Sequence, residues 1–214
     1  MPAPENEQEQ VTQWIKWAQK LQAIAQNGLN FSQNPFDRLR YEDIKVVAAQ
    51  IFSSFTGTGT TAIMDIFDSQ AGYATPKVDV RGVIFKDEKI LLVKELSDGG
   101  WTLPGGWVDV GESPSQAVER EVWEESGYIV QAVKLMAVYD RNLHGHPPHP
   151  FQIYKLFFLC QLTGGNAVDS IETTQASFFT EEEIPPLSLA RTTPGQIKRA
   201  FEYNRQPDLE TDFD

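Results

Sequence analysis

The chain has 214 residues, of which 41% are hydrophobic, and a formal net charge of −12. This length suffices for one sizeable core, or for an ordinary domain with a small helical one, and we expect the second arrangement. The acidic balance argues against a stable nucleic-acid partner, because phosphate backbones are bound through clustered Lys and Arg. A small phosphorylated ligand stays compatible with an acidic chain whose own carboxylates hold a divalent cation.

The cysteine content and the N-terminus bear on the cellular compartment. Cys160 is the single cysteine, which excludes an intramolecular disulfide framework and fits a reducing compartment. The first ten residues are acidic and polar, and no apolar run reaches the length that spans a membrane. We therefore expect a cytoplasmic protein with no membrane partner.

Apolar residues recur at helical spacing in the first third of the chain. The pattern predicts a helix over 11–27 that ends at Asn27-Gly28, a second helix from about 38 or 41 to 55, and a third over 61–68. Residues 1–72 are thus expected to form an N-terminal helical domain. So small a unit has little core of its own, which leaves open either a homodimer, through exposed candidates Trp14, Trp17 and Phe36, or docking on the rest of the chain.

After Pro76 the pattern changes to the alternation that is typical of strands. Residues 78–93 predict a hairpin that turns at 86–89, further strands are expected at 128–139, 151–162 and about 176–180, and helices are expected at 113–126 and 193–204. Strands of mixed direction with helices outside them predict an α/β (α+β) fold over residues 77–205. The acidic tail 207–214 is expected to fray.

Three carboxylates share one face of the expected helix 113–126. Glu121, Glu124 and Glu125 are three and four residues apart, and like charges so placed destabilise a helix by roughly 0.2–0.5 kcal/mol per pair. A divalent cation removes this cost, and oxygen ligands select Mg²⁺ or Mn²⁺. Such an ion can neutralise a pyrophosphate, polarise the phosphorus and activate a water molecule. For an isolated Glu-x-x-Glu-Glu run, a solvated helix face is the alternative.

The sequence around these carboxylates resembles the Nudix box. The identity positions of the box are all met at its spacing, by Gly106, Glu112, Arg120, Glu121, Glu124, Glu125 and Gly127. Tyr128 stands where the pattern prefers an aliphatic residue. The resemblance extends over 76–204 and implies a Nudix α/β/α sandwich with a mixed sheet, while residues 34–42 resemble the small helical domain that precedes one Nudix subgroup.

The resemblance also implies roles for single residues. The implied metal ligands are three carboxylates and one backbone carbonyl, those of Glu121, Glu124, Glu125 and Gly105. Glu112 and Arg120 are expected to pair and to hold the loop against the helix. Glu121 and Glu172 are both candidates for the general base. Gln175 occupies a position near Glu172 where family members commonly carry a Glu.

Four basic side chains outside the box are candidates to contact an anionic substrate: Arg81, Arg141, His144 and His146. Arg81 lies in the first expected strand and needs an anionic partner if it is buried; a phosphate and a structural carboxylate such as Glu112 are equally open. Arg141 and the two histidines belong to the loop 139–150, which looks like that of the subgroup. Either substrate contact or a rigid polar loop would explain them.

Members of this subgroup are associated with CDP-choline and ADP-ribose type hydrolysis. The resemblance implies a Nudix pyrophosphohydrolase, dependent on Mg²⁺ or Mn²⁺, that cleaves the phosphoanhydride bond of a nucleoside diphosphate linked to a small moiety. Our first expectation is hydrolysis of CDP-choline to CMP and phosphocholine. The alternative is an ADP-ribose pyrophosphatase that yields AMP and ribose 5-phosphate. A noncatalytic Nudix-fold nucleotide sensor is the alternative of another class, and the complete set of box carboxylates disfavours it.

Overall fold

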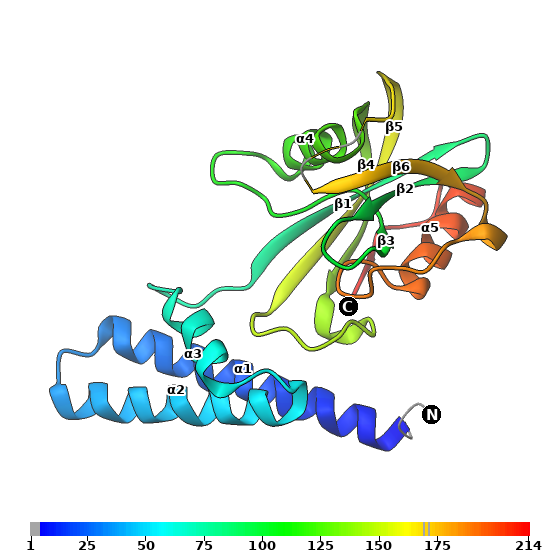
Figure 1. Cartoon of the computed structure of the whole chain (residues 1–214). Helices are drawn as coiled ribbons and strands as arrows, with labels where there is room; N and C mark the ends of the chain where they lie inside the picture. The colour runs from blue at the N-terminus through cyan, green and yellow to red at the C-terminus, as the bar shows by residue number, and fades with distance from the viewer. Residues whose placement is uncertain (1–4, 169, 171) are drawn as a thin grey trace. The chain divides into compact units, whose positions relative to one another are not determined.

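The computed structural model describes residues 5–168, 170 and 172–214 and divides into two compact units (Figure 1). The helical unit comprises Met1–Pro76 and Pro148–Gln152, and the sheet unit comprises Lys77–Pro147 and Ile153–Asp214. Over the described residues, no helix combines the length and the apolar character that crossing a bilayer requires.

The helical unit contains three helices: α1 (Glu5–Phe31), α2 (Pro35–Thr56) and α3 (Thr60–Asp68). The prediction that the first helix ends at Asn27-Gly28 is wrong, because α1 continues to Phe31. Gly28 serves packing instead of termination, since a Cβ atom there would lie 2.3 Å from the ring of Tyr41. Helix α2 begins earlier than expected because Asn34 accepts a hydrogen bond from the Phe36 N–H.

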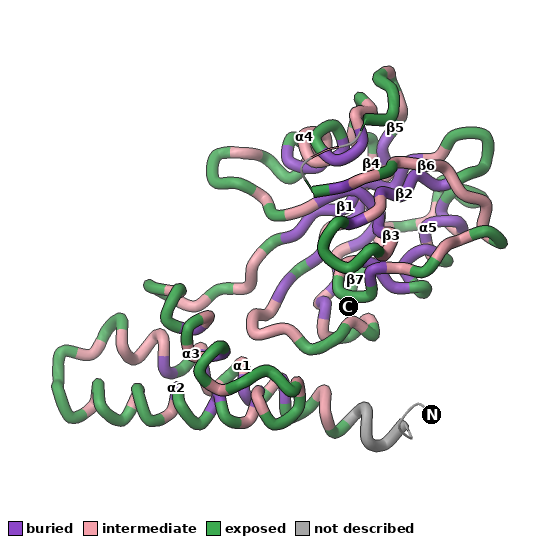
Figure 2. Tube along the Cα trace, viewed as in Figure 1, coloured by how far each residue is buried: buried purple, intermediate pink, exposed green. Residues whose placement is uncertain are grey.

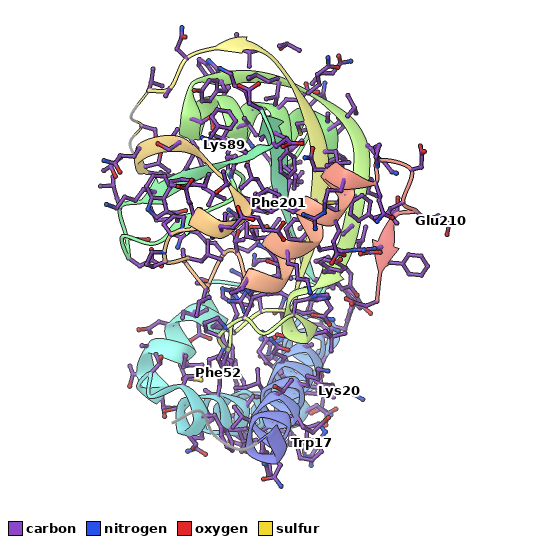
Figure 3. All side chains as sticks on the ribbon, turned by 90° about the vertical axis from the view of Figure 1, so that its right-hand side faces the viewer. Trp17, Lys20, Phe52, Lys89, Phe201 and Glu210 are labelled. Atoms are coloured by element: carbon purple, nitrogen blue, oxygen red, sulfur yellow. The ribbon has the colours of Figure 1, made fainter. Side chains whose placement is uncertain are left out.

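Apolar side chains from all three helices form the core of this unit. Small residues such as Ala18 and Ala48 are fully buried beside Phe52 and Phe67, which allows the helices to approach closely. Other large apolar side chains stay at the surface, among them Trp17, whose exposed fraction is 47% (Figure 3). The burial pattern in Figure 2 shows exposed and half-buried positions along most of α2. The unit therefore combines an apolar core with several large apolar side chains at its surface.

The sheet unit is built on seven strands: β1 (Lys77–Lys86), β2 (Lys89–Glu95), β3 (Trp101–Thr102), β4 (Tyr128–Asp140), β5 (Ile153–Gly165), β6 (Thr173–Phe179) and β7 (Asp212–Phe213). The strand order is β3-β2-β1-β5-β4-β7, and β6 pairs with β2. Strands β1 and β5 are parallel, whereas β4 and β5 are antiparallel, so the sheet is mixed as predicted.

Helices cover the two faces of the central strands. Val80 and Ile84 of β1 belong to the core beneath α4 (Pro114–Ser126), whereas Val83 belongs to the core beneath α5 (Pro194–Arg205). Because successive side chains of a strand point to opposite faces, α4 and α5 lie on opposite sides of β1 (Figure 1). Two short 3₁₀ helices, η1 (Arg141–Leu143) and η2 (Glu181–Glu183), complete the unit. The expected α/β/α sandwich, preceded by a helical region, is confirmed.

The expected hairpin is present, with Phe85 opposite Ile90 and a turn whose two central residues have positive φ, Asp87 at 49° and Glu88 at 61°. The prediction for the acidic tail is wrong. Its last residues form β7, which runs parallel to β4, and Arg199 of α5 binds Asp212. The tail is ordered because its carboxylates find basic partners that lie far away in the sequence.

Candidate active site

Local signals fix the start and the end of α4. Ser113 caps the helix by accepting a hydrogen bond from the Gln116 N–H, and the Gln116 side-chain oxygen accepts one from the Ser113 N–H. Pro114 occupies the first turn. Gly127 ends the helix at φ 76°, in the left-handed region that favours glycine. In the helix that begins and ends at these residues, the face that carries Glu121 points toward the loop 104–107.

The glycines of this loop allow it to pass very close to β1. The Val80 N–H donates to the Gly106 carbonyl at 2.8 Å, and the Gly82 N–H donates to the Pro104 carbonyl at 2.8 Å. Gly105 has φ 142°, and a Cβ atom there would lie 2.1 Å from the carbonyl oxygen of Val80. Only glycine fits this position.

On its other side the loop contacts the box helix. The Gly105 N–H donates to Glu125 Oε2 at 2.9 Å, and a Cβ atom at Gly106 would lie 2.7 Å from Glu121 Oε2. The loop therefore brings its backbone against two of the three box carboxylates. The sequence analysis did not predict these contacts, and the role that it implied for the Gly105 carbonyl stays a prediction.

The three carboxylates differ in their surroundings. Glu125 is 5% exposed, and burial raises its pKa to about 8 even though the charge of Arg81 acts in the opposite direction. Burial also raises the pKa of Glu121, against the effect of Arg120. The side chain of Glu124 is 48% exposed. The helix face thus carries a buried acid at Glu125, a partly buried one at Glu121 and a half-exposed one at Glu124.

Arg120 contacts three of the box glutamates, Glu112, Glu121 and Glu124. Its Nε and Nη2 lie 2.8 and 2.9 Å from the two carboxylate oxygens of Glu112, which is the pair that the family resemblance implied. Its Nη1 lies 2.9 Å from Glu121 Oε1 and 2.9 Å from Glu124 Oε2. This pairing neutralises part of the like-charge repulsion on the helix face.

The box face has the donor chemistry of a site for a hard cation. In the ranges 5–168, 170 and 172–214, no three His, Cys, Asp or Glu side chains converge as a ready-made metal site, and the box carboxylates are bound instead to Arg120 and to the Gly105 N–H. The donors present are nevertheless oxygens only, on one helix face beside the two glycines of the loop, Gly105 and Gly106. That set fits Mg²⁺ or Mn²⁺.

Arg81 is buried and pairs with a carboxylate that sequence reasoning missed. Its Nε and Nη2 donate to Asp79 at 3.0 and 2.7 Å, so its partner is Asp79 and not the Glu112 that we had considered. Lys155 of β5 donates to the same carboxylate at 2.6 Å. Burial alone would raise the pKa of Asp79, but the two cations outweigh it and hold that pKa at about 2.

Two sequence signals could have revealed this buried cluster. Asp79 and Arg81 are two residues apart in an alternating strand, which places them on the same face. Lys155 is the one basic residue in an otherwise apolar run from 153 to 160, where a lone charge needs a partner. The sequence did not show that β1 and β5 are adjacent and that Asp79 stands opposite Lys155 in the register.

Arg141, at the end of β4, is 4% exposed. Its guanidinium donates to the carbonyls of Pro147 at 2.6 Å and Ala190 at 3.2 Å, so both of its acceptors are neutral. Burial lowers the pKa of Arg141 to about 10. A buried cation whose acceptors are neutral carbonyls favours an anionic ligand.

The two candidate histidines of the same loop face different neighbours. His146 Nδ1 lies 2.8 Å from the Leu189 carbonyl and its Nε2 lies 2.9 Å from Gln196 Nε2, and burial lowers the pKa of His146 to about 3. His144 stacks on Tyr139, with 3.9 Å between ring centroids, and its Nε2 lies 2.8 Å from Asp214 Oδ1. His146 is therefore neutral and next to α5, while His144 is held by the tail.

Glu172 is exposed at the start of β6, next to a residue that contacts α4. The Thr173 hydroxyl donates to the Glu125 carbonyl at 2.5 Å, and the Leu96 N–H donates to the Glu172 carbonyl at 3.0 Å. The late loop predicted to carry this candidate base includes position 171, which lies outside the described residues. The segment of Glu172 therefore touches the helix that bears the box.

The comparison with known families agrees with this geometry. Residues 75–201 match the family described as NUDIX domain. The chain belongs to the Nudix family. It is a Nudix pyrophosphohydrolase, a class of enzyme that typically uses a divalent metal ion, so the expectation of an enzyme of this class is confirmed. Residues 12–67 match the UDP-X-like, N-terminal oligomerisation domain.

Relatives of this Nudix protein include both sequences and solved structures. A Bacillus subtilis protein with the provisional name ADP-ribose pyrophosphatase YjhB is 43% identical over 203 residues, which cover 95% of this chain and 98% of that protein. A crystal structure of an ADP-ribose pyrophosphatase from Streptococcus suis is 41% identical, with TM-score 0.61, and covers 65% of this chain and 100% of its own. A crystal structure of UDP-X diphosphatase is 32% identical, with TM-score 0.61, over 95% of this chain and 99% of its own.

Proposed function

We propose that this Nudix enzyme hydrolyses ADP-ribose to AMP and ribose 5-phosphate. The observation that carries the proposal is the similarity, over almost the whole of both chains, to the Bacillus subtilis protein with that provisional name. The Streptococcus suis structure supports it over 65% of this chain. These relatives favour the alternative of our sequence analysis over CDP-choline, our first expectation. The UDP-X diphosphatase structure makes a UDP-linked compound the second candidate.

The proposed cation ligands are the carboxylates of Glu121, Glu124 and Glu125, with the Gly105 carbonyl as a further one. The bound ion, Mg²⁺ or Mn²⁺, would neutralise the diphosphate and lower the pKa of a water molecule. The chain itself supports this role with a buried acid, Glu125, that the loop backbone holds in place at 2.9 Å. Arg120 is available to balance the charge of the same face.

Two residues are candidates for the general base. Glu121 lies against the glycine loop, and burial raises its pKa, whereas Glu172 is exposed on a segment that touches α4 through Thr173. Because Glu121 is also a proposed cation ligand, the deciding variant is Glu172→Gln. Lost turnover with unchanged Mn²⁺ affinity in Glu172→Gln assigns the base to Glu172, and retained turnover in that variant assigns it to Glu121.

Four basic residues are proposed to serve the anionic substrate. Arg141 and His146 lie in one loop beside α5, and Arg81 lies close enough to Glu125 for their charges to interact. We rank these residues as phosphate ligands by the charge of the groups that they already bind. Arg141 has neutral acceptors only, whereas Arg81 is already neutralised by Asp79 and His144 is bound to Asp214. Arg141 is therefore the side chain that gains most from a phosphate.

Product analysis tests the proposed substrate. The full chain is incubated with ADP-ribose, a UDP-linked sugar and CDP-choline at equal concentration with Mg²⁺, and the mononucleotides are resolved by chromatography. We expect AMP to appear with the highest kcat/KM. Faster release of UMP or CMP overturns the assignment to ADP-ribose, and no mononucleotide from any of the three overturns the whole proposed chemistry.

We also propose that the helical unit joins two copies of the chain. It matches the oligomerisation domain over 12–67, and its surface carries an aromatic cluster in which Trp14 contacts Trp17 at 4.9 Å and Phe55 at 5.9 Å between ring centroids. Phe36 adds a further exposed ring, at 69%. Sedimentation velocity of Trp17→Ser is expected to show monomers, with Trp123→Ser as the matched control on the sheet unit. A dimer that survives Trp17→Ser contradicts this surface.

A further inference from the structure

We propose that Asp212 and Asp214 of the C-terminal tail are positioning residues that hold the loop 141–147 ready for substrate. The inference rests on the proposed function, because that function assigns Arg141 and His146 of this loop to the substrate. It goes further by giving the tail a role in recognition. No signal in the sequence predicted this, since the tail was expected to fray.

Asp214 binds the start of the loop through both of its carboxylate oxygens. Oδ1 lies 2.8 Å from His144 Nε2, and Oδ2 accepts a hydrogen bond from the Asp140 N–H at 2.5 Å. His144 is also stacked on Tyr139, with a centroid separation of 3.9 Å and an interplanar angle of 25°. One carboxylate therefore fixes a backbone amide and a side chain of the turn that follows β4.

Asp212 anchors the tail that presents Asp214. Arg199 of α5 forms a two-point pair with it, with Nε to Oδ2 at 2.5 Å and Nη2 to Oδ1 at 2.7 Å, and the Tyr139 hydroxyl donates to Oδ2 at 2.9 Å. The strand pairing of Ala137 with Asp212 sets the register of the tail along β4. The tail thus joins β4, α5 and the loop in one network.

The two proposed substrate residues of the loop, Arg141 and His146, make their hydrogen bonds to neutral groups. Arg141 donates to the carbonyl of Pro147 within the loop and to that of Ala190 outside it, and His146 contacts Leu189 and Gln196. A loop that must be ordered at the moment of binding weakens affinity by the entropy that it loses, whereas a preordered loop does not. The tail supplies that order before the substrate arrives.

A purely structural role for the tail is the competing explanation. In that case Asp212 and Asp214 stabilise the edge of the sheet, and their loss lowers the melting temperature without changing KM in the folded protein. Substrate positioning predicts a different signature, a raised KM with a nearly unchanged kcat, because the chemistry on α4 is untouched. The split between KM and kcat therefore separates the two explanations.

The test measures ADP-ribose kinetics of the full chain in four forms, the wild type, Asp214→Ala, Asp214→Asn and Asp208→Ala. Asp208 is an exposed acid of the same tail. Asp208→Ala therefore makes the same change in charge but leaves the contacts of Asp214 with His144 and Asp140 in place. We expect Asp214→Ala to raise KM by roughly tenfold with kcat within about twofold of the wild type. We expect Asp214→Asn to restore most of the affinity, because an amide can still accept from the Asp140 N–H and donate to the other tautomer of His144.

A double-mutant cycle with His144→Ala adds an independent readout. If Asp214 acts on the loop through His144, adding Asp214→Ala to His144→Ala changes KM little further. An unchanged KM in Asp214→Ala, or one equal to that of Asp208→Ala, overturns the positioning role even if the enzyme is active. A wild type that hydrolyses no nucleoside diphosphate compound overturns the proposed function instead, and the inference falls with it.

Discussion

The two units of the chain bury very different kinds of residue. In the helical unit the described core is apolar, and its buried polar residues are Gln22 and Lys45. Among the described residues of the sheet unit, six acidic or basic side chains are nine-tenths or more buried: Asp79, Arg81, Glu95, Glu125, Arg141 and Lys155. Burying a charge is costly unless it is paired, so this concentration marks the sheet unit as the place of chemistry. The helical unit has instead the features of an assembly element.

The largest expected effect follows from removing one charge from the box helix. Glu124→Gln and Glu125→Gln should each lower kcat for ADP-ribose roughly 10²–10³-fold, because each loses a carboxylate that would hold the cation. Rates of AMP release at saturating Mg²⁺ measure this effect. Glu182→Gln, an exposed acid of η2, is the matched control and should keep full activity. Near-normal rates in both Glu124→Gln and Glu125→Gln would contradict the assignment of the chemistry to the box helix of the sheet unit.

A change in the helical unit should instead affect stability. Gly28→Ala places a Cβ atom 2.3 Å from the ring of Tyr41, and we expect it to lower the free energy of unfolding by about 1–3 kcal/mol. Gly195→Ala in α5 is the control, because a Cβ atom there meets nothing within 4 Å, and it should be stabilising by roughly 0.5–1 kcal/mol. Urea titrations measure both. Equal effects of the two variants would show that α1 and α2 do not pack as described.

A third expected effect concerns the acid sensitivity of the sheet unit. Burial lowers the pKa of His146 to about 3, from its ordinary value of 6.5, so the unfolded chain binds a proton between these values and the folded chain does not. The folded state therefore loses stability as the pH falls from about 6.5 toward 3, by at most about 1.4 kcal/mol per pH unit. His146→Gln should flatten this slope in urea titrations at pH 7 and pH 5. If the wild type and His146→Gln lost equal free energy of unfolding between pH 7 and pH 5, folding would not lower the pKa of His146.

The sequence was sufficient wherever structure follows from near neighbours. The Ser113 cap, the Gly127 stop and the spacing of the box carboxylates define α4 by themselves, and the turn at 86–89 defines the hairpin. The pair of Arg120 with Glu112 was available from the box resemblance, and the bonds are present at 2.8 and 2.9 Å.

The remaining features depend on contacts between distant residues. Nothing near Gly28 in the sequence shows that Tyr41 packs on it, so a packing glycine was mistaken for a helix stop. The partner of Arg81 was missed for a related reason, since the pair with Lys155 requires the parallel register of β1 and β5. The order of the tail depends on Arg199 and His144, which lie 13 and 70 residues from their acidic partners.

Binding of Mn²⁺, followed by electron paramagnetic resonance of the free ion, tests the central claim most directly. The wild-type protein should take up Mn²⁺ saturably, and Glu182→Gln should match it. Glu125→Gln should bind the ion at least about tenfold more weakly, because a charged oxygen ligand is lost. Identical Mn²⁺ titration curves for the wild type and for Glu121→Gln, Glu124→Gln and Glu125→Gln would contradict the claim that this helix face holds the catalytic cation.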